Sequence, residues 1–138
     1  MNSVFTDASF WIGLRDTKDQ FHRDALKATR YFMENRFHLV LTPLVFAEVH
    51  AQFSRARITS AKVIADCWDN PVVKIERPSV ADEEQGIEIL RANRDKSYSF
   101  CDAVSFAVML RLGINRVVTF DHHFRQFGQF TVIDGRNL

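Results

Sequence analysis

Two aspartates stand directly behind short apolar runs that have the pattern of buried β-strands. Asp7 follows residues 4–6 (VFT), and Asp121 follows residues 116–120 (RVVTF). A segment with helical character comes next in both cases, so each carboxylate marks a junction between a strand and a helix. In parallel α/β sheets, ligands collect at the carboxyl ends of the strands. Both aspartates are therefore predicted to lie at the functional edge of such a sheet.

Two further acids are predicted to lie in the early turns of helices. Asp102 comes three residues after Ser99, which can act as an N-cap, so the two form an approximate capping box. Glu48 lies inside the apolar segment LVFAEVHA, behind the helix start that Thr42 and Pro43 predict. A carboxylate in such surroundings is costly unless it is paired or lies near a cation. Both acids are expected at the same edge of the sheet as the two aspartates.

Together the four acids predict a site for a hard divalent cation. Two like charges ~4 Å apart repel by roughly 4 kcal/mol at an effective dielectric constant near 20. Such a group must hold protons or a cation, and oxygen ligands suit Mg²⁺ or Mn²⁺ better than zinc. A bound cation can orient and polarise a phosphodiester and lower the pKa of a water, and two ions ~3.5–4 Å apart stabilise both the attacking and the leaving oxygen.

Each acid also has an ordinary structural explanation when it is taken alone. Asp7, Asp102 and Asp121 could be helix caps, and Glu48 could form a buried salt bridge with an arginine. These explanations stay open for each residue by itself. The combination of four acids, each on a suitable element, favours the cation site.

Ser9 and Thr119 are expected to support the acids. Ser9 could hydrogen-bond Asp7 or a metal-bound water, and Thr119 could bond a carboxylate or such a water. Serine in a first helical turn and threonine in a strand are also common without any function. His122 and His123 lack the HExxH spacing of a zinc site, so histidine is not expected to take part in the chemistry.

The elements that would position these acids alternate between strands and helices. Gly113 ends the helix that Asp102 opens, and a strand follows after only a short turn. Such alternation is typical of a parallel sheet in an α/β fold. The expected strands are 4–6, 37–41, 72–75, 116–120 and 130–133, and the expected helices are 8–14, 20–35, one that begins at 43, 58–68, 80–94, 100–112 and 122–127.

The segment YSFCDAVSFAVMLRLGINRVVTFDHHF resembles the C-terminal half of a PIN domain, and most of all that of a VapC-type toxin ribonuclease. In this family an aspartate opens a helix, and the next strand ends in Thr-x-Asp before His-Phe. The sequence matches this pattern at Asp102, Thr119, Asp121, His123 and Phe124. Upstream, Asp7 and Ser9 match the opening D-x-S pattern, and Glu48 matches a glutamate in the helix after the second strand. The resemblance covers essentially the whole chain.

The resemblance implies one PIN-like domain over residues 1–138, a three-layer α/β/α sandwich with a central parallel sheet. It implies a Mg²⁺- or Mn²⁺-dependent endoribonuclease, with one or two ions, that leaves a 5′-phosphate and a 3′-hydroxyl. Asp7, Glu48, Asp102 and Asp121 would be both the catalytic residues and the metal ligands. It also implies a toxin of a type II toxin–antitoxin system, a homodimer, and inhibition by a small antitoxin whose tail fills the acidic groove.

Composition constrains where the protein acts and on what. The chain of 138 residues has a formal net charge of +1, so RNA would need a local basic patch. Cys67 and Cys101 form no CxxC pair and are expected to be reduced and buried, with a cytoplasmic location. No apolar run is long enough to span a membrane, and a secretory leader is not expected. The predicted RNA contacts are Arg15, Arg94 and Lys96, with Lys18, Arg55 and Arg57 as further candidates and solvated surface as the ordinary alternative for each.

Two alternative functions would use a similar fold. A PIN-like domain could bind RNA or protein without cleaving, but this requires the loss of one ligand acid, and none is visibly lost. A phosphohydrolase of the HAD type would need a second aspartate two residues after Asp7, where this sequence has Ser9. The sequence therefore favours the ribonuclease.

Overall fold

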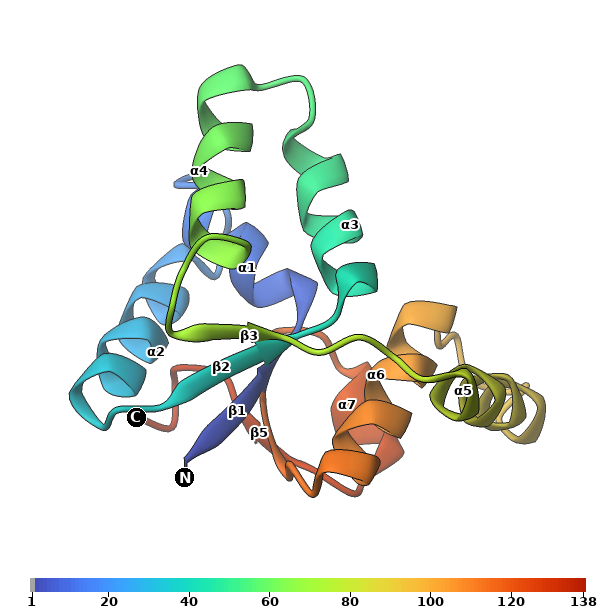
Figure 1. Ribbon diagram of the computed structural model, residues 1–138. Helices are drawn as coiled ribbons and strands as arrows, with labels where there is room; N and C mark the ends of the chain where they lie inside the picture. The colour runs from blue at the N-terminus through green and yellow to red at the C-terminus, as the bar shows by residue number, and fades with distance from the viewer. Residues whose placement is uncertain (1) are drawn as a thin grey trace.

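A five-stranded sheet lies at the centre of the computed structural model, which describes residues 2–138 (Figure 1). All of its strand pairings are parallel, and the order across the sheet is β3-β2-β1-β4-β5. The chain runs outward from β1 to β3 and then crosses to the other side of β1 for β4 and β5, which makes the β1/β4 boundary the switch point where ligands collect. The strands are β1 Ser3–Thr6, β2 His38–Leu41, β3 Val73–Ile75, β4 Arg116–Val118 and β5 Thr131–Ile133.

Helices cover the sheet on both faces. Helices α1, α3 and α4 lie on one side of the sheet, and α6 and α7 lie on the other (Figure 1). Helices α3 and α4 form a hairpin that projects from the body of the molecule, and α5 packs against α6 (Figure 1). The predicted three-layer α/β/α sandwich is thus confirmed. The helices are α1 Ala8–Arg15, α2 His22–Glu34, α3 Pro43–Phe53, α4 Arg57–Cys67, α5 Val80–Ala92, α6 Phe100–Leu112 and α7 His123–Phe127.

The helix ends follow the capping signals of the sequence. Ser99 caps α6 in a full capping box with Asp102, and Gly113 ends this helix in the left-handed conformation with φ 68°. Thr42 Oγ1 accepts a hydrogen bond from the backbone of α3, and Pro43 is the first residue of that helix. These local signals fix where α3 and α6 begin, and therefore where Glu48 and Asp102 lie.

Strand β4 is shorter than predicted and ends at Val118 instead of Phe120. Thr119 still donates its backbone N–H to the carbonyl of Ile133 (3.2 Å), but the chain then bends. The ring of Phe120 leaves the sheet and stacks on Phe21, with 4.7 Å between the ring centroids. Asp121 therefore lies in a bend and does not directly follow the strand. The other element boundaries differ from the predicted ones by a few residues at most.

The core lies between the sheet and its two helical layers. Phe5 and Val118 of the central strands are completely buried, as are Phe106 of α6 and Phe124 of α7. Cys67 and Cys101 are buried and free, as predicted. Within residues 2–138, no helix combines the length and the apolar character that crossing a bilayer would require.

Candidate active site

Asp7 begins the site at the end of β1. Its backbone N–H donates to the carbonyl of Val118 (3.1 Å), which fixes the residue at the β1/β4 boundary. It occupies the N-cap position of α1, but its side chain makes no capping hydrogen bond. The buried carboxylate instead accepts at Oδ2 from Ser9 Oγ (3.0 Å) and Thr119 Oγ1 (2.8 Å). The helix-cap explanation therefore fails for Asp7, and the hydrogen bonds considered for Ser9 and Thr119 are present.

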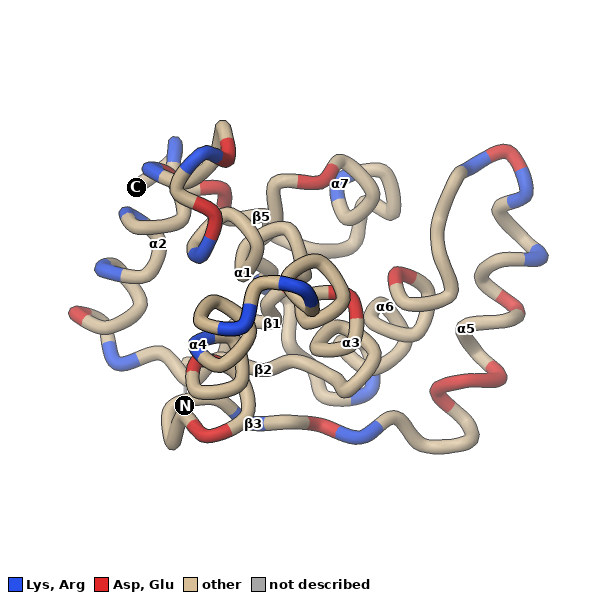
Figure 2. Tube along the Cα trace, turned by 90° about the horizontal axis from the view of Figure 1, so that it is seen from above, with Lys and Arg blue, Asp and Glu red and all other residues tan. Residues whose placement is uncertain are grey.

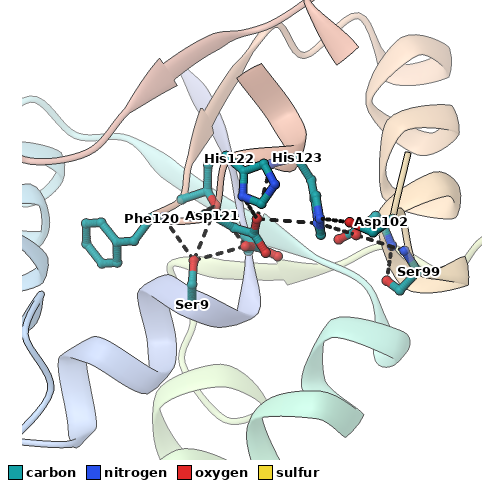
Figure 3. A network of polar contacts seen from close by, with 10 residues as sticks. Ser9, Ser99, Asp102, Phe120, Asp121, His122 and His123 are labelled. Atoms are coloured by element: carbon teal, nitrogen blue, oxygen red, sulfur yellow. Dashed lines mark hydrogen bonds and ion pairs between the residues drawn. The ribbon is translucent and has the colours of Figure 1, made fainter. Parts of the chain in front are cut away.

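The same two hydroxyls tie the turn after β4 to the start of α1. Phe120 donates its backbone N–H to Ser9 Oγ (2.9 Å; Figure 3), and Asp121 donates its backbone N–H to Thr119 Oγ1 (3.0 Å). Each hydroxyl thus accepts from the turn and donates to Asp7. This arrangement holds Asp7 and Asp121 in a fixed relation, although they are far apart in the sequence.

Asp102, in the first turn of α6, uses one carboxylate oxygen for two contacts. Oδ2 accepts from the backbone N–H of Ser99 (3.0 Å), and Ser99 Oγ accepts in return from the backbone N–H of Asp102 (3.0 Å). The same Oδ2 lies 2.8 Å from Nδ1 of His123 (Figure 3). The helix-cap explanation is thus correct for Asp102. It does not exclude a second role, because Oδ1 accepts no hydrogen bond within residues 2–138.

Asp121 enters the site from the bend between β4 and α7. Its Oδ1 accepts from the backbone N–H of His123 (3.1 Å) and lies 3.3 Å from Nδ1 of both His122 and His123. Figure 3 shows the side chain on the same side as Asp102, with the His123 ring between the two. The bend was not predicted from the sequence, and it directs the Asp121 carboxylate toward His123.

Glu48 lies on α3, and although the residue as a whole is exposed, its carboxylate is partly buried and its pKa is affected by the other acids. Its pKa is raised by burial of the carboxylate and then by the charges of Asp102 and Asp121, while a side-chain hydrogen bond with Cys101 opposes the shift. In the described part of the chain, Glu48 has no arginine or lysine partner. The buried salt bridge that the sequence left open is therefore not formed there.

The electrostatics of the site indicate a shortage of positive charge. The pKa of Asp7 is raised to about 6, mainly by burial and also by the charge of Asp102, while the hydrogen bonds from Thr119 and Ser9 oppose the rise. For an aspartate this is a large upward shift, since the ordinary value is near 4. A divalent cation would relieve both the burial cost and the repulsion between the carboxylates.

His123 also lies among these acids, although histidine was not expected from the sequence to take part in the chemistry. Its Nδ1 lies 2.8 Å from Asp102 Oδ2 and 3.3 Å from Asp121 Oδ1, and Nε2 lies 3.2 Å from Ser97 Oγ. The ring meets Tyr98 edge to face, with 5.7 Å between centroids. The signal that could have found it is the position two residues after Asp121, where a chain that turns into a helix folds back over the preceding side chain.

The donor set suits a divalent cation, but it is not the purely acidic group that was predicted. In the described part of the chain, one group of three metal-ligating side chains has all its ligand atoms within 4.8 Å of one another: Asp121, His122 and His123. The buried Nδ1 of His123 has no hydrogen-bond partner of correct direction. Asp102 contacts His123 of this group, and the charge of Asp102 acts on both Asp7 and Glu48.

The three predicted RNA contacts have different surroundings. Arg15 forms a two-point ion pair with Asp66 of α4, so its guanidinium is already held by a carboxylate outside the site. Lys96 pairs with its neighbour Asp95 (2.8 Å) on the surface. Arg94 is exposed in the segment between α5 and α6. The structure therefore leaves Arg94 and Lys96 accessible to a ligand and ties Arg15 into the packing of α1 against α4.

Comparisons with known proteins agree with this fold. The sequence signature of the PIN domain matches residues 4–129. The chain is 32% identical over 126 residues to the 23S rRNA-specific endonuclease VapC20 in two strains of Mycobacterium tuberculosis, which covers 91% of this chain and 94% of the relative. A crystal structure of Mycobacterium tuberculosis VapC20, described as a sarcin–ricin loop cleaving toxin, superposes with a TM-score of 0.80 at 28% identity over 91% of this chain and 95% of that one. These similarities confirm the likeness to VapC-type toxin ribonucleases. The chain belongs to the PIN domain family.

Proposed function

We propose that this chain, acting as a single unit over residues 1–138, is a divalent-metal-dependent endoribonuclease and the toxin of a type II toxin–antitoxin pair. The observation that supports the proposal is that contacts link the four acids: Thr119 joins Asp7 to the turn of Asp121, His123 contacts Asp121 and Asp102, and the charges of Asp102 and Asp121 act on Glu48. Within residues 2–138, none of these four carboxylates is paired with an arginine or a lysine. Acids that serve only the fold are normally paired when they are buried.

A Mg²⁺ or Mn²⁺ ion, alone or as one of two, would supply neutralisation of the scissile phosphate and activation of a water at this group. Contacts within the protein orient Asp7 and favour the ionised form of Asp102, which suits both for binding such an ion. Ser9 and Thr119 hold Oδ2 of Asp7 and leave Oδ1 without a hydrogen bond in the described residues. The N-terminus of α6 favours the ionised form of Asp102.

The RNA would approach over a surface that carries cations on either side of the acids. Arg94 and Lys96 lie in the segment before α6, and both are exposed. Figure 2, which looks down on the tip of the α3–α4 hairpin, shows further basic positions there, and Arg55 and Arg57 of that tip are exposed. Phosphate contacts of this kind position a nucleic acid without reading its sequence. Arg15 would contribute only if RNA displaced Asp66.

The substrate that we propose is a structured loop of 23S rRNA, by analogy with the activity for which the relative VapC20 is named. We also propose that the protein acts in the cytoplasm as a homodimer and is inhibited by a small antitoxin. These three properties rest on the resemblance to VapC toxins alone. The non-catalytic alternative would require one ligand acid to be neutralised by an arginine, and the described residues contain no such pair at the site.

The test is cleavage of a short RNA that contains the sarcin–ricin loop of 23S rRNA, with the products resolved on a sequencing gel. Wild-type protein should cut this RNA with Mg²⁺ or Mn²⁺, and EDTA should stop the reaction until Mn²⁺ is added back. Asp7→Asn should abolish cleavage. Asp95→Asn is the matched control, because Asp95 is an exposed aspartate in the segment before α6 whose one ion pair among residues 2–138 is with Lys96.

The outcomes separate the elements of the proposal. Cleavage that resists EDTA would contradict the metal dependence and would point to a histidine mechanism. Unchanged cleavage by Asp7→Asn would remove the catalytic assignment of the acids. Metal-dependent cleavage of other RNAs, with no cut in the sarcin–ricin loop, would contradict only the proposed substrate.

A further inference from the structure

The imidazole of His123 occupies the space between two of the acids proposed to bind metal. Its Nδ1 lies 2.8 Å from Asp102 Oδ2 and 3.3 Å from Asp121 Oδ1 (Figure 3). The side chain is only 14% exposed, and the ring is held at its edge by Tyr98. A ring held in this position presents the nitrogen to the acids in a fixed direction.

The hydrogen bonding of this ring is incomplete in one place. Nε2 lies 3.2 Å from Ser97 Oγ, which gives that nitrogen a partner. Nδ1 is buried and has no partner whose direction suits a hydrogen bond, in spite of its short distance to Asp102. When Nε2 donates to Ser97, Nδ1 carries a lone pair that faces two carboxylate oxygens. Such an arrangement is repulsive unless a proton or a cation lies between the nitrogen and the oxygens.

The distance from His123 Nδ1 to each of the two carboxylate oxygens is close to that between neighbouring ligands on one ion. Neighbouring ligands on an octahedral ion with bonds of roughly 2.1 Å lie about 3 Å apart. The distances from His123 Nδ1 to the oxygens of Asp102 and Asp121 fall on either side of this value, at 2.8 and 3.3 Å. A bond from one ring nitrogen to the metal and a hydrogen bond from the other is also the usual arrangement of a metal-binding histidine.

We infer that His123 Nδ1 is a metal ligand beside Asp102 and Asp121, so that the cation site of this chain contains nitrogen as well as oxygen. This inference rests on the proposed metal dependence and adds a ligand that an all-carboxylate site lacks. Imidazole strengthens the binding of transition ions and contributes little to Mg²⁺ binding. The site should therefore prefer Mn²⁺ to Mg²⁺ more strongly than four carboxylates alone would.

The two other histidines near the site are weaker choices. His122 touches Asp121 at 3.3 Å and its ring lies 4.6 Å from the ring of His123, but its side chain is 67% exposed, so it is held less firmly than His123. His50 lies 3.2 Å from Ser60 Oγ and stacks on Phe46, on the hairpin side of α3. His122→Asn is therefore the matched control, because it removes an adjacent imidazole that can reach Asp121.

The experiment is a titration of the full-length protein with Mn²⁺, followed by electron paramagnetic resonance. Pulsed measurements on the bound ion should show coupling to ¹⁴N in the wild type and in His122→Asn, and the coupling should disappear in His123→Asn. The affinity for Mn²⁺ should fall about 10- to 100-fold in His123→Asn. The affinity for Mg²⁺, measured by competition, should fall less.

A labelled sample makes the result independent of the variant. Wild-type protein and His122→Asn, both with ¹⁵N-histidine, should show the ¹⁵N coupling in place of the ¹⁴N coupling even if His123→Asn does not fold, and the His122→Asn sample excludes His122 as the source. Absence of any histidine coupling in a wild-type protein that binds Mn²⁺ and cleaves RNA would overturn the inference and leave the proposed function intact. A wild-type protein that binds no Mn²⁺ at all would overturn both. Coupling that persists in folded His123→Asn would assign the nitrogen to another residue and overturn the inference.

Discussion

Helices α5 and α6 begin with the same local motif but in opposite electrostatic surroundings. Ser79 and Asp82 form a capping box at the start of α5, and Ser99 and Asp102 form one at the start of α6. Both aspartates are buried, at 4% and 8% exposure. Asp82 accepts hydrogen bonds from Arg111 Nε at 3.0 Å, whereas Asp102 faces a histidine and other carboxylates.

The difference between the two helix starts is one of charge balance. Burial alone would raise the pKa of Asp82, but hydrogen bonds from Arg111 and Ser79 outweigh it and lower the pKa. At the other start the charge of Asp102 adds to the burial that raises the pKa of Asp7. The first site is neutralised within the protein, and the second needs charge from outside. A capping motif therefore shows where a carboxylate lies, while its neighbours in space decide whether it can bind a cation.

The largest expected effect comes from making the same substitution, aspartate to asparagine, in the capping boxes of α5 and α6. Asp102→Asn should reduce RNA cleavage by roughly 10³-fold or more, because it removes a charged ligand from the proposed metal site. Asp82→Asn makes the same chemical change at the other capping box and should leave cleavage per folded molecule unchanged. Single-turnover assays with both variants measure this ratio. Equal losses in the two variants would show that the cap, and not the cation site, accounts for the loss of activity.

The second effect concerns stability without metal. Because the pKa of Asp7 is raised to about 6, the folded protein binds this proton more tightly than the unfolded chain. This contribution to stability is present below pH 4, is lost as the pH rises to about 6, and stays lost above it. Asp7→Asn should therefore be more stable than the wild type in EDTA at pH 7, by on the order of 2–3 kcal/mol.

Urea unfolding at several pH values measures this difference. The gain should grow between pH 4 and pH 6 and remain constant at higher pH. Addition of Mn²⁺ should stabilise the wild type and reduce or reverse the gain, since the ion would relieve the buried charge. A gain that does not change with pH would assign the effect to packing instead of charge.

Removing a charge should lower stability where an acid is already neutralised by an arginine, as at Asp82. Arg111→Met leaves Asp82 buried without its cation and also removes the contact to Glu76 at 3.0 Å. Because the Arg111 side chain is 39% exposed, a loss of about 1–3 kcal/mol in unfolding free energy is expected. Thermal and urea unfolding would show the loss, with cleavage by the folded fraction retained. A stability equal to the wild type would mean that water replaces Arg111 at little cost.

The smallest effect is expected from the hydroxyls that hold Asp7. Thr119→Val keeps the shape of the side chain but removes the hydrogen bond to Asp7 Oδ2 (2.8 Å) and the acceptor for Asp121 N–H (3.0 Å). Mn²⁺ affinity should fall about tenfold, which corresponds to roughly 1.4 kcal/mol. Isothermal titration with Mn²⁺ measures this change. Thr29→Val, which removes a hydroxyl bonded to a helix carbonyl far from the site, is the control and should bind Mn²⁺ as the wild type does.

Much of the architecture was predictable because it depends on short-range signals. Alternating apolar runs, the N-caps Thr42 and Ser99 and the stop at Gly113 place strands and helices within a few residues of their observed bounds. The end of β4 was not predictable, because the stacking of Phe120 on Phe21 and the hydrogen bond to Ser9 come from distant parts of the chain. The apolar, β-branched run itself gave no sign of a bend.

The sequence by itself determined that Asp7 stands at a strand end and Asp102 at a helix start, since periodicity and capping act within a few residues. Only the tertiary structure decided how these acids are partnered. Arg15 is drawn to Asp66, His123 enters the site between Asp102 and Asp121, and Glu48 is left without a cation in the described residues. The physical reason is that the charge state of a buried carboxylate depends on groups within a few ångströms in space. Those groups come from segments that the fold, and not the order of the chain, brings together.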